Sequence, residues 1–266
     1  MLDERACPRG LVRKRAFNCQ ALHGQDGKSH ELCTAAGYYS ACEHKALFDF
    51  NPVHVMKINE IYNAISGEGA TAGRVCTIVR VSGCNLRCSY CDTTYAYDAG
   101  IEMSTSVILD HIEMDDVLYT GGEPLYLKDA ALNFLKALQV KRKRVFVETN
   151  GSIDIRPFTG FAHLVMDIKT PSSKMHKAML FENIKFLDSM DEIKFVVEDR
   201  LDYDYANRIV QMHNALSYTK NIYISPAWGN IEFIQELSKW MIADKSNMLL
   251  SLQQHKIIWP PEKRGV

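Results

Sequence analysis

Apolar runs of strand length alternate with helix-like stretches after residue 56, and this alternation constrains the fold more than any other feature. The runs are rich in Val, Ile, Phe and Tyr, and they span residues 75–81, 116–120, 144–149, 163–168, 192–197 and 221–225. Apolar residues recur at helical spacing over 128–141, 201–216 and 231–242. This alternation predicts an α/β fold with a parallel sheet and right-handed crossovers. Six units rather than eight favour an incomplete (β/α)6-type barrel.

The first 55 residues lack this regularity. They show neither a helical stripe nor clean alternation, and they contain four scattered cysteines, Cys7, Cys19, Cys33 and Cys42. We therefore expect residues 1–55 to form an irregular, poorly ordered N-terminal extension and residues 56–266 to form the main domain. The alternative is a small metal-binding appendage, but these cysteines lack the close C-x2-C pairs that structural zinc sites use.

Composition excludes several classes of function. The chain of 266 residues has a formal net charge of −1, so no basic field favours binding to nucleic acid. The sequence contains no run of 18 apolar residues, so we expect no membrane span. The basic N-terminus is not followed by the apolar segment of a signal peptide. We expect a cytoplasmic protein, in which the eight cysteines serve as ligands or packed thiols rather than disulfides.

The unusual residues follow the ends of the predicted strands. The run at 75–81 leads into SGCNLRCSYCDT, and the next runs lead into GGEP, NGS, KTPSSK and PAWG. Turns generally favour Gly, Pro, Asn and Ser, which accounts for any one of these loops. In parallel α/β folds, however, ligands gather at the C-terminal ends of the strands. The pattern therefore predicts one shared site at the mouth of the barrel.

Three closely spaced cysteines give this site its chemistry. Cys84, Cys88 and Cys91 form C-x3-C-x2-C, and thiolates are the usual ligands of iron–sulfur clusters, which normally take four. Three ligands favour a [4Fe–4S] cluster with one open iron, on which S-adenosylmethionine (SAM) can bind for radical chemistry. The competing hypothesis is a zinc site, which requires a fourth ligand from Cys76, His54 or Asp92.

The motifs resemble those of the radical SAM superfamily and, within it, the 7-carboxy-7-deazaguanine synthase family. The resemblance covers Met56 to Val266 and rests on CNLRCSYC, TGGEP, EIYNAISGEGATAGR, ETNGS, DIKTPSS, EIKFVV and SLQQHKIIW. It implies conversion of 6-carboxy-5,6,7,8-tetrahydropterin to 7-carboxy-7-deazaguanine, with loss of ammonia, as in queuosine biosynthesis. It also implies a 5′-deoxyadenosyl radical that removes hydrogen from C6, catalytic use of SAM, assistance by Mg²⁺, an electron donor such as flavodoxin or ferredoxin, and a homodimer.

Roles transfer by resemblance to individual positions. Cluster ligands are Cys84, Cys88 and Cys91, and the magnesium ligand is Thr93. Contacts to SAM fall on Tyr90, Cys91, Asp92, Gly122, Glu148, Asn150, Lys169 and Ser225. Contacts to the pterin fall on Ile65, Ser66, Gly67, Arg80 and Thr120.

Two segments depart from the family pattern. The stretch Asp167–Lys169 stands where other members carry S-P-K, and PPEKRGV extends the C-terminal tail. We assign His255 and Lys256 to packing and solubility. The alternatives to this function are another radical SAM enzyme, such as a glycyl-radical-enzyme activase, and a zinc-stabilised binding module.

Overall fold

The computed structural model describes residues 21–23, 29–31, 55–227, 231–260 and 263–265. The chain divides into two compact units, Met1–Phe48 and Asp49–Val266. In the first unit, strand β1 (Ala21–His23) pairs antiparallel with β2 (Ser29–Glu31). Apart from these two strands, residues 1–54 lie outside the described part of the chain. This applies to most of the segment predicted to be poorly ordered and to the alternative metal site at Cys7, Cys19, Cys33 and Cys42.

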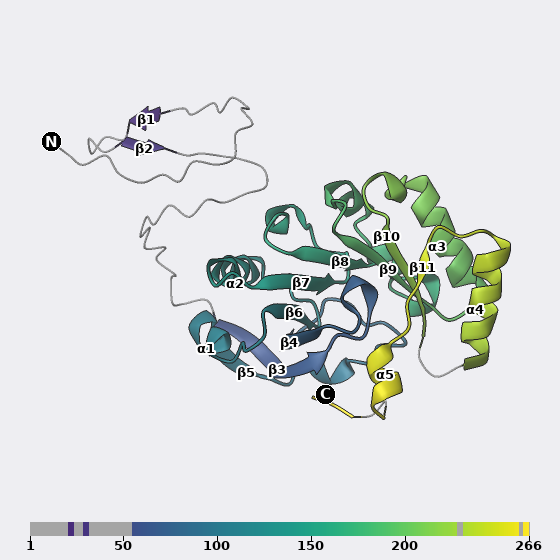
Figure 1. Ribbon diagram of the computed structural model, residues 1–266, viewed down its shortest axis with the longest axis horizontal. Coiled ribbons are helices and arrows are strands. Elements are labelled where there is room, and N and C mark those ends of the chain that lie inside the picture. The colour runs from purple at the N-terminus through teal and green to yellow at the C-terminus, as the bar shows by residue number, and fades with distance from the viewer. Residues whose placement is uncertain (1–20, 24–28, 32–54, 228–230, 261–262, 266) are drawn as a thin grey trace, which may run out of the picture. The chain divides into compact units, whose positions relative to one another are not determined.

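The second unit is built on one nine-stranded sheet of order β11-β10-β9-β8-β7-β6-β4-β3-β5 (Figure 1). Its strands are β3 (Val55–Ile65), β4 (Val75–Val81), β5 (Ile101–Ser104), β6 (Asp116–Gly121), β7 (Arg144–Thr149), β8 (His163–Asp167), β9 (Glu192–Val197), β10 (Asn221–Pro226) and β11 (Leu249–Leu250). The six predicted runs are β4 and β6 to β10, and neighbours among them are parallel. The sheet does not close, because β5 and β11 are its two edges, so the predicted incomplete α/β barrel is confirmed.

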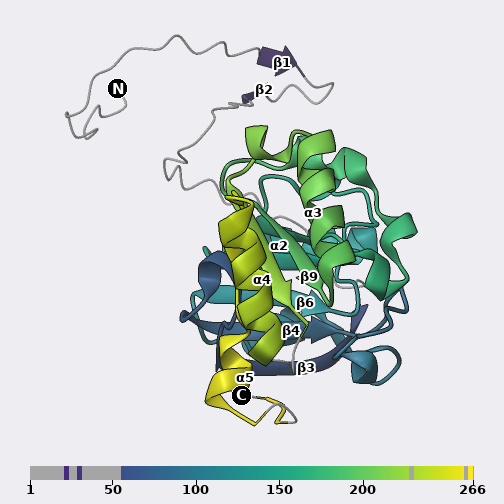
Figure 2. The ribbon, with the colours of Figure 1, turned by 90° about the vertical axis from the view of Figure 1, so that its right-hand side faces the viewer.

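The predicted helices are present as α2 (Lys128–Val140), α3 (Arg200–Met212) and α4 (Ile231–Ala243). Two short helices, α1 (Thr105–Asp110) and α5 (Gln254–Ile258), complete the set in the described residues. Figure 2 shows α3 and α4 side by side on the outer side of the sheet. None of these helices is long and apolar enough to cross a membrane.

Two crossovers use 3₁₀ turns in place of α-helices. The turn at Arg156–Phe158 follows β7, and the turns at Pro171–Ser173, His176–Ala178 and Phe181–Phe186 follow β8. Pro157 and Pro171 lie at the start of the first two turns, where the missing backbone N–H of proline is tolerated.

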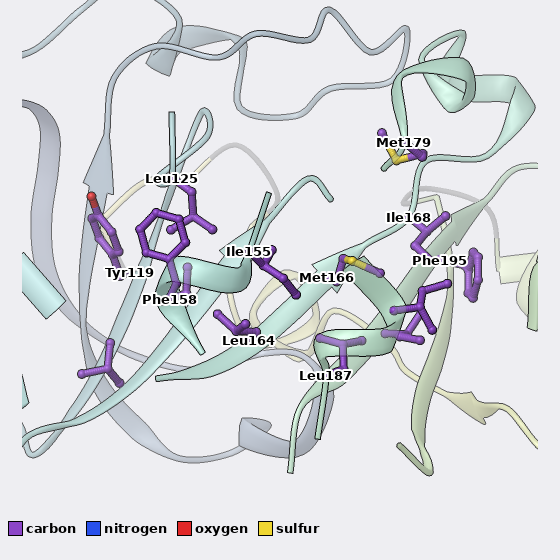
Figure 3. Packing of buried hydrophobic residues seen from close by; sticks show 14 of the residues in the cluster. Tyr119, Leu125, Ile155, Phe158, Leu164, Met166, Ile168, Met179, Leu187 and Phe195 are labelled. Atoms are coloured by element: carbon purple, nitrogen blue, oxygen red, sulfur yellow. The ribbon is translucent and has the colours of Figure 1, made fainter. Parts of the chain in front are cut away.

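Alternation along the strands separates an apolar outer face from a polar inner face. Tyr119, Leu164, Met166 and Phe195 point into the main hydrophobic core, where they are at most 1% exposed (Figure 3). Residues at alternate positions on the same strands have the opposite orientation, since successive side chains of a strand leave on opposite faces. The charged residues of the sheet thus gather on the inner face, beneath the loops that carry the predicted site.

Candidate active site

The cysteine motif lies in the loop that leaves β4 and ends before the 3₁₀ turn Thr94–Ala96. Cys84, Cys88 and Cys91 are each half-buried and unpaired by disulfides. Burial, with smaller effects of Asp167, Cys91 and Cys84, raises the pKa of the Cys88 thiol to about 11, although the charge of Lys169 opposes the shift. The three thiols are therefore electrostatic neighbours, and a cluster must displace their protons when it binds.

Hydrogen-bond donors surround these sulfurs. The backbone N–H of Leu86 lies 3.4 Å from Cys84 Sγ, and Asn150 Nδ2 lies 3.8 Å from the same sulfur. Burial, together with the neighbouring Cys91, raises the pKa of the Tyr97 hydroxyl. Donors of this kind stabilise thiolates and tune the potential of an iron–sulfur cluster. Three thiols with such donors suit a [4Fe–4S] cluster that leaves one iron for another ligand.

A single-metal site receives no support from the arrangement. Within residues 55–227 and 231–260, no three His, Cys, Asp or Glu side chains form a group that could hold one metal ion, and this finding includes Cys84, Cys88 and Cys91. Cys76, one suggested fourth ligand, is 2% exposed in a small apolar cluster with Ile78 and Leu118. His54, another suggested ligand, lies outside the described residues.

The glycine-rich loop after β6 packs against the cysteine loop. Glu123 N donates to the Gly83 carbonyl over 2.8 Å, and Gly122 N donates to the Val81 carbonyl over 3.1 Å. An added Cβ at Gly122 would overlap the Gly83 carbonyl and touch Cys84. The absent side chain thus permits a close approach to the loop that carries the cysteines.

Glu123, which sequence reasoning did not assign, joins this loop to the end of β7. Its carboxylate accepts from Leu125 N at 3.0 Å, Thr149 Oγ1 at 2.8 Å and Asn150 N at 2.7 Å. Burial raises its pKa to about 7. The signal in the sequence was the single acidic residue within TGGEP. Its contacts hold Asn150 beside Cys84 and Asn85. Asn150 Nδ2 donates to Asn85 Oδ1 over 2.9 Å.

The predicted pterin contacts on the sheet lie on adjacent strands. Arg80 of β4 is paired in register with Thr120 of β6, and Thr120 donates to Glu148 of β7 over 2.7 Å. Arg80 Nε contacts Glu60 of β3 at 2.7 Å, and its Nη2 donates to the Tyr62 hydroxyl over 3.3 Å. Burial raises the pKa of Glu148, while the charge of Arg80 opposes this effect. Three of the predicted residues therefore share one electrostatic environment.

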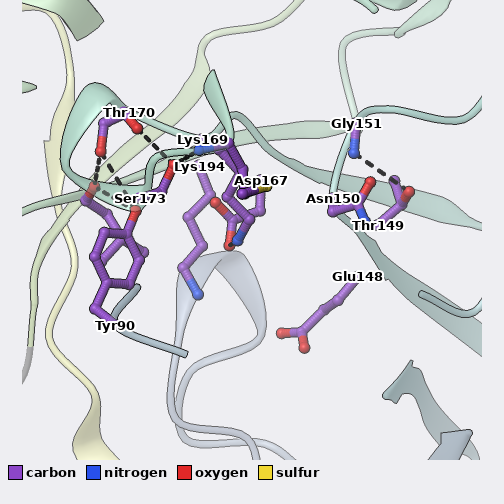
Figure 4. A network of polar contacts seen from close by, with 12 residues as sticks. Tyr90, Glu148, Thr149, Asn150, Gly151, Asp167, Lys169, Thr170, Ser173 and Lys194 are labelled. Atoms are coloured by element: carbon purple, nitrogen blue, oxygen red, sulfur yellow. Dashed lines mark hydrogen bonds and ion pairs between the residues drawn. The ribbon is translucent and has the colours of Figure 1, made fainter. Parts of the chain in front are cut away.

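The predicted SAM contacts beyond β7 also line this face (Figure 4). Lys169 Nζ lies 2.8 Å from Asp167. Burial alone would lower the pKa of Lys169, but Asp167 and Cys88 raise it well above its usual range. The Tyr90 hydroxyl lies 3.3 Å from Thr170 Oγ1 and from the Val196 carbonyl.

Ser225 at the end of β10 is 1% exposed, and its hydroxyl has no protein partner. An unpaired buried hydroxyl is costly, which suits a position that meets a ligand.

The entry loop between β3 and β4 contains the remaining predicted pterin contacts. Ile65 ends β3 with a 40% exposed side chain, and the Ser66 hydroxyl lies 2.6 Å from that of Thr71. Gly67 accepts from Gln254 N over 3.0 Å, and a Cβ at Gly67 would overlap His255. The C-terminal segment is therefore in direct contact with this loop.

Lys256 was assigned to packing and solubility. Its side chain is 11% exposed, and its Nζ lies 2.7 Å from Asp92. Burial alone would raise the pKa of Asp92, but Lys256 and the Thr93 hydroxyl, which donates over 2.9 Å, hold it below its usual value. The α5 helix thereby contacts the residues that follow Cys91.

A small cavity lies on the inner face below these loops. Its lining comes from the entry loop and five strands, and consists of Glu68, Gly69, Thr71, Leu118, Glu148, Val165, Glu192, Lys194 and Tyr223. Lys194 contacts Glu68, which also accepts from Gln253. Sequence reasoning assigned none of these three residues. The run EIKFVV did contain a signal for this pocket, because Glu192 and Lys194 are charged residues at alternate positions of an otherwise apolar strand.

Comparisons with known proteins show the family of this chain. Residues 78–210 match the model of the radical SAM superfamily. A 7-carboxy-7-deazaguanine synthase from Clostridium acetobutylicum is 40% identical, over 79% of this chain and 99% of the relative. One from Koribacter versatilis is 32% identical, over 79% of this chain and 100% of the relative.

A crystal structure of QueE from Escherichia coli has the same fold. It aligns with a TM-score of 0.63 at 20% identity, over 79% of this chain and 99% of the bacterial protein. The cysteine loop, the polar inner face and the near full-length match to these relatives lead to one conclusion. This chain is a radical SAM enzyme and belongs to the 7-carboxy-7-deazaguanine synthase family.

Proposed function

We propose that this enzyme converts 6-carboxy-5,6,7,8-tetrahydropterin to 7-carboxy-7-deazaguanine and ammonia. The observation that carries the proposal is the position of Arg80, whose guanidinium is held by Glu60 and Tyr62 on the same face as Thr120 and Glu148. A planar guanidinium is suited to bind the substrate carboxylate with two parallel hydrogen bonds. The reaction itself is proposed from the family to which the chain belongs.

The cofactors of the proposed reaction are a [4Fe–4S] cluster and SAM. Cys84, Cys88 and Cys91 hold the cluster in this proposal. When bound, cluster and SAM supply the hydrogen-atom abstraction at C6 with which the conversion begins. The proposed SAM contacts are Tyr90, Cys91, Asp92, Gly122, Glu148, Asn150, Lys169 and Ser225.

The remaining site residues bind the pterin and a magnesium ion. Ile65, Ser66 and Gly67 contact the pterin from the entry loop, where the Ser66 hydroxyl shares its hydrogen bonding with Thr71. Thr93 offers a hydroxyl ligand to Mg²⁺, which prefers hard oxygen donors and keeps several waters. Asp92 fixes that hydroxyl, because Thr93 Oγ1 donates to it.

Further properties extend the proposal to the whole protein. We propose a cytoplasmic homodimer that receives electrons from flavodoxin or ferredoxin and acts in queuosine or another 7-deazapurine pathway. Residues 1–55 are not part of the site in this proposal, so a protein that begins at Met56 should retain activity.

Anaerobic incubation with SAM, dithionite, Mg²⁺ and the pterin tests the proposed function. Mass analysis should detect 7-carboxy-7-deazaguanine and ammonia in equal amounts, with many products formed per SAM. Omission of Mg²⁺ should slow the reaction. A glycyl-radical-enzyme activase would cleave SAM without consuming the pterin, and that result would overturn the proposal.

A further inference from the structure

Lys194 is a buried ammonium that the steps described so far do not use. It stands in the middle of β9, its side chain is 13% exposed, and it contacts the Glu68 carboxylate from the entry loop, whose side chain is 12% exposed. Buried lysines are rare unless they are paired or functional. The pair lines the small cavity on the inner face, which is bounded by Glu148, and Glu148 accepts a hydrogen bond from Thr120, one of the proposed pterin contacts.

We propose that Lys194 is the proton donor to the nitrogen that leaves as ammonia, and that Glu68 accepts the proton lost from the ring. This inference rests on the proposed function and deepens it. Figure 4 shows the side chains of Lys194 and Glu148 directed into the same space. The donor therefore lies inside the cavity and not on the outer surface.

The chemistry of ammonia loss requires such a pair. Product and ammonia together contain all atoms of the substrate, so the elimination needs no oxidant or reductant. The C–N bond breaks with its electron pair on nitrogen, which takes a proton from Lys194. The electrons of a ring C–H bond form the new double bond, and that proton passes to Glu68. Transfer from Glu68 to Lys194 then restores the ion pair, so no proton is gained or lost overall.

The surroundings of Lys194 suit proton donation. Burial and, to a smaller degree, the charge of Lys256 lower the pKa of Lys194 to about 8. The Glu68 carboxylate lies in contact with the ammonium as its counter-ion. A buried ammonium that is protonated at rest but gives up its proton readily is a suitable general acid.

Groups from every neighbouring element face this ammonium. They are Glu68 of the entry loop, Glu192 of β9, Asp167 of β8, Tyr223 of β10, Glu148 of β7 and Lys256 of α5. Carboxylates predominate among them, and Glu68 is the one in direct contact with Lys194.

Two substitutions separate proton donation from positioning. Lys194→Gln keeps a hydrogen-bond donor for Glu68 but has no proton to transfer, and Lys194→Met has neither. Lys220→Met is the matched control, because Lys220 is exposed and its ammonium donates to the Leu216 carbonyl. Each protein is reconstituted with its cluster and given a pterin that carries deuterium at C6.

Three measurements decide the proposal. Product and ammonia release should fall on the order of 100-fold in both Lys194 variants, as for loss of a general acid. Transfer of deuterium into SAM, which reports hydrogen abstraction, should stay within a few-fold of wild type. Pterin binding to the cluster-free proteins should also stay within a few-fold. The control should match wild type in all three.

Other outcomes overturn the proposal. Wild-type rates of ammonia release in Lys194→Gln would assign Lys194 a positioning role only. An equal loss of deuterium transfer, or of pterin binding, would also exclude a specific role in elimination. If the wild-type enzyme itself does not consume the pterin, the proposed function fails as well.

Discussion

The Lys256 ammonium lies 2.7 Å from a carboxylate oxygen of Asp92, the residue that directly follows the third cysteine of the motif. These residues are 164 positions apart in the chain. The contact fastens α5 to the segment that carries Cys91 and Thr93, so the end of the chain helps to hold the cofactor loop.

Removal of this contact should weaken SAM binding. Lys256→Met leaves Asp92 without its main cationic neighbour, so the pKa of Asp92 should rise and its loop should lose a fixed attachment. Residues that support ligands in this way typically change affinity by about 10- to 100-fold. Equilibrium SAM binding to the reconstituted protein measures the effect. Unchanged affinity, with intact iron content, would show that the ion pair does not position the loop.

Gly122→Ala should disrupt the cysteine loop. The new Cβ would overlap the Gly83 carbonyl, so the loops after β4 and β6 must separate. We expect reduced iron content and a lower melting temperature. Gly73→Ala is the control, because nothing lies within 4 Å of its new Cβ and only its positive φ of 83° is unfavourable, at about 1 kcal/mol. Equal iron content in the two variants would contradict the close packing described.

Glu192 should make stability depend on pH. Burial raises its pKa to about 7 from the ordinary 4.5, so the folded protein holds a proton that the unfolded chain releases. Its contribution to stability therefore declines as pH rises between these values. In cluster-free protein, Glu192→Gln removes this dependence, so its melting temperature relative to wild type should rise from about pH 5 to about pH 8.

A control variant separates this effect from the loss of any glutamate. Glu182 is exposed, and its ion pair with Lys185 lowers its pKa. Glu182→Gln should therefore show no such rise over the same range. A constant difference between wild type and Glu192→Gln would mean that Glu192 titrates normally.

The extended tail should contribute to pterin binding. The Arg264 guanidinium lies 3.8 Å from the centre of the Tyr95 ring, and the Tyr95 hydroxyl donates to Glu60, which holds Arg80. Arg264→Ala removes a cation–π contact of about 1 kcal/mol, so KM should rise about 5-fold while kcat changes little. Lys263→Ala is the control, since Lys263 lies over Trp259 instead. A fall in kcat without a change in KM would contradict this role.

The sequence predicted six of the parallel strands because each is a short, continuous apolar run, whereas the two-residue edge strand β11 was missed. The antiparallel strands β3 and β5 were also missed, since MKINEIYNAI mixes core residues such as Met56 and Ile58 with polar ones near the edge of the sheet. The 3₁₀ crossovers after β7 and β8 were also missed, because periodicity shows where a helix can form and not how compact a connection is.

The site was predicted where a motif is local. The cysteine triplet was located by its spacing, and TGGEP by its place after a predicted strand and by its resemblance to the family motif. The ion pair of Glu68 with Lys194 spans 126 positions, and no local pattern reveals such a contact. The roles of Lys194, Gln253 and Lys256 depend on how the sheet brings the entry loop to the chain's C-terminal segment.

Cluster content provides the most direct test of the central claim, that Cys84, Cys88 and Cys91 hold a cluster with one iron open to SAM. After anaerobic reconstitution, wild type and the Cys76→Ala control should each contain about four irons per chain, and SAM should change the electron paramagnetic resonance signal of the reduced cluster. Cys88→Ala should lack this cluster. Retention of four irons in Cys88→Ala, or a signal that SAM leaves unchanged in wild type, would contradict the account.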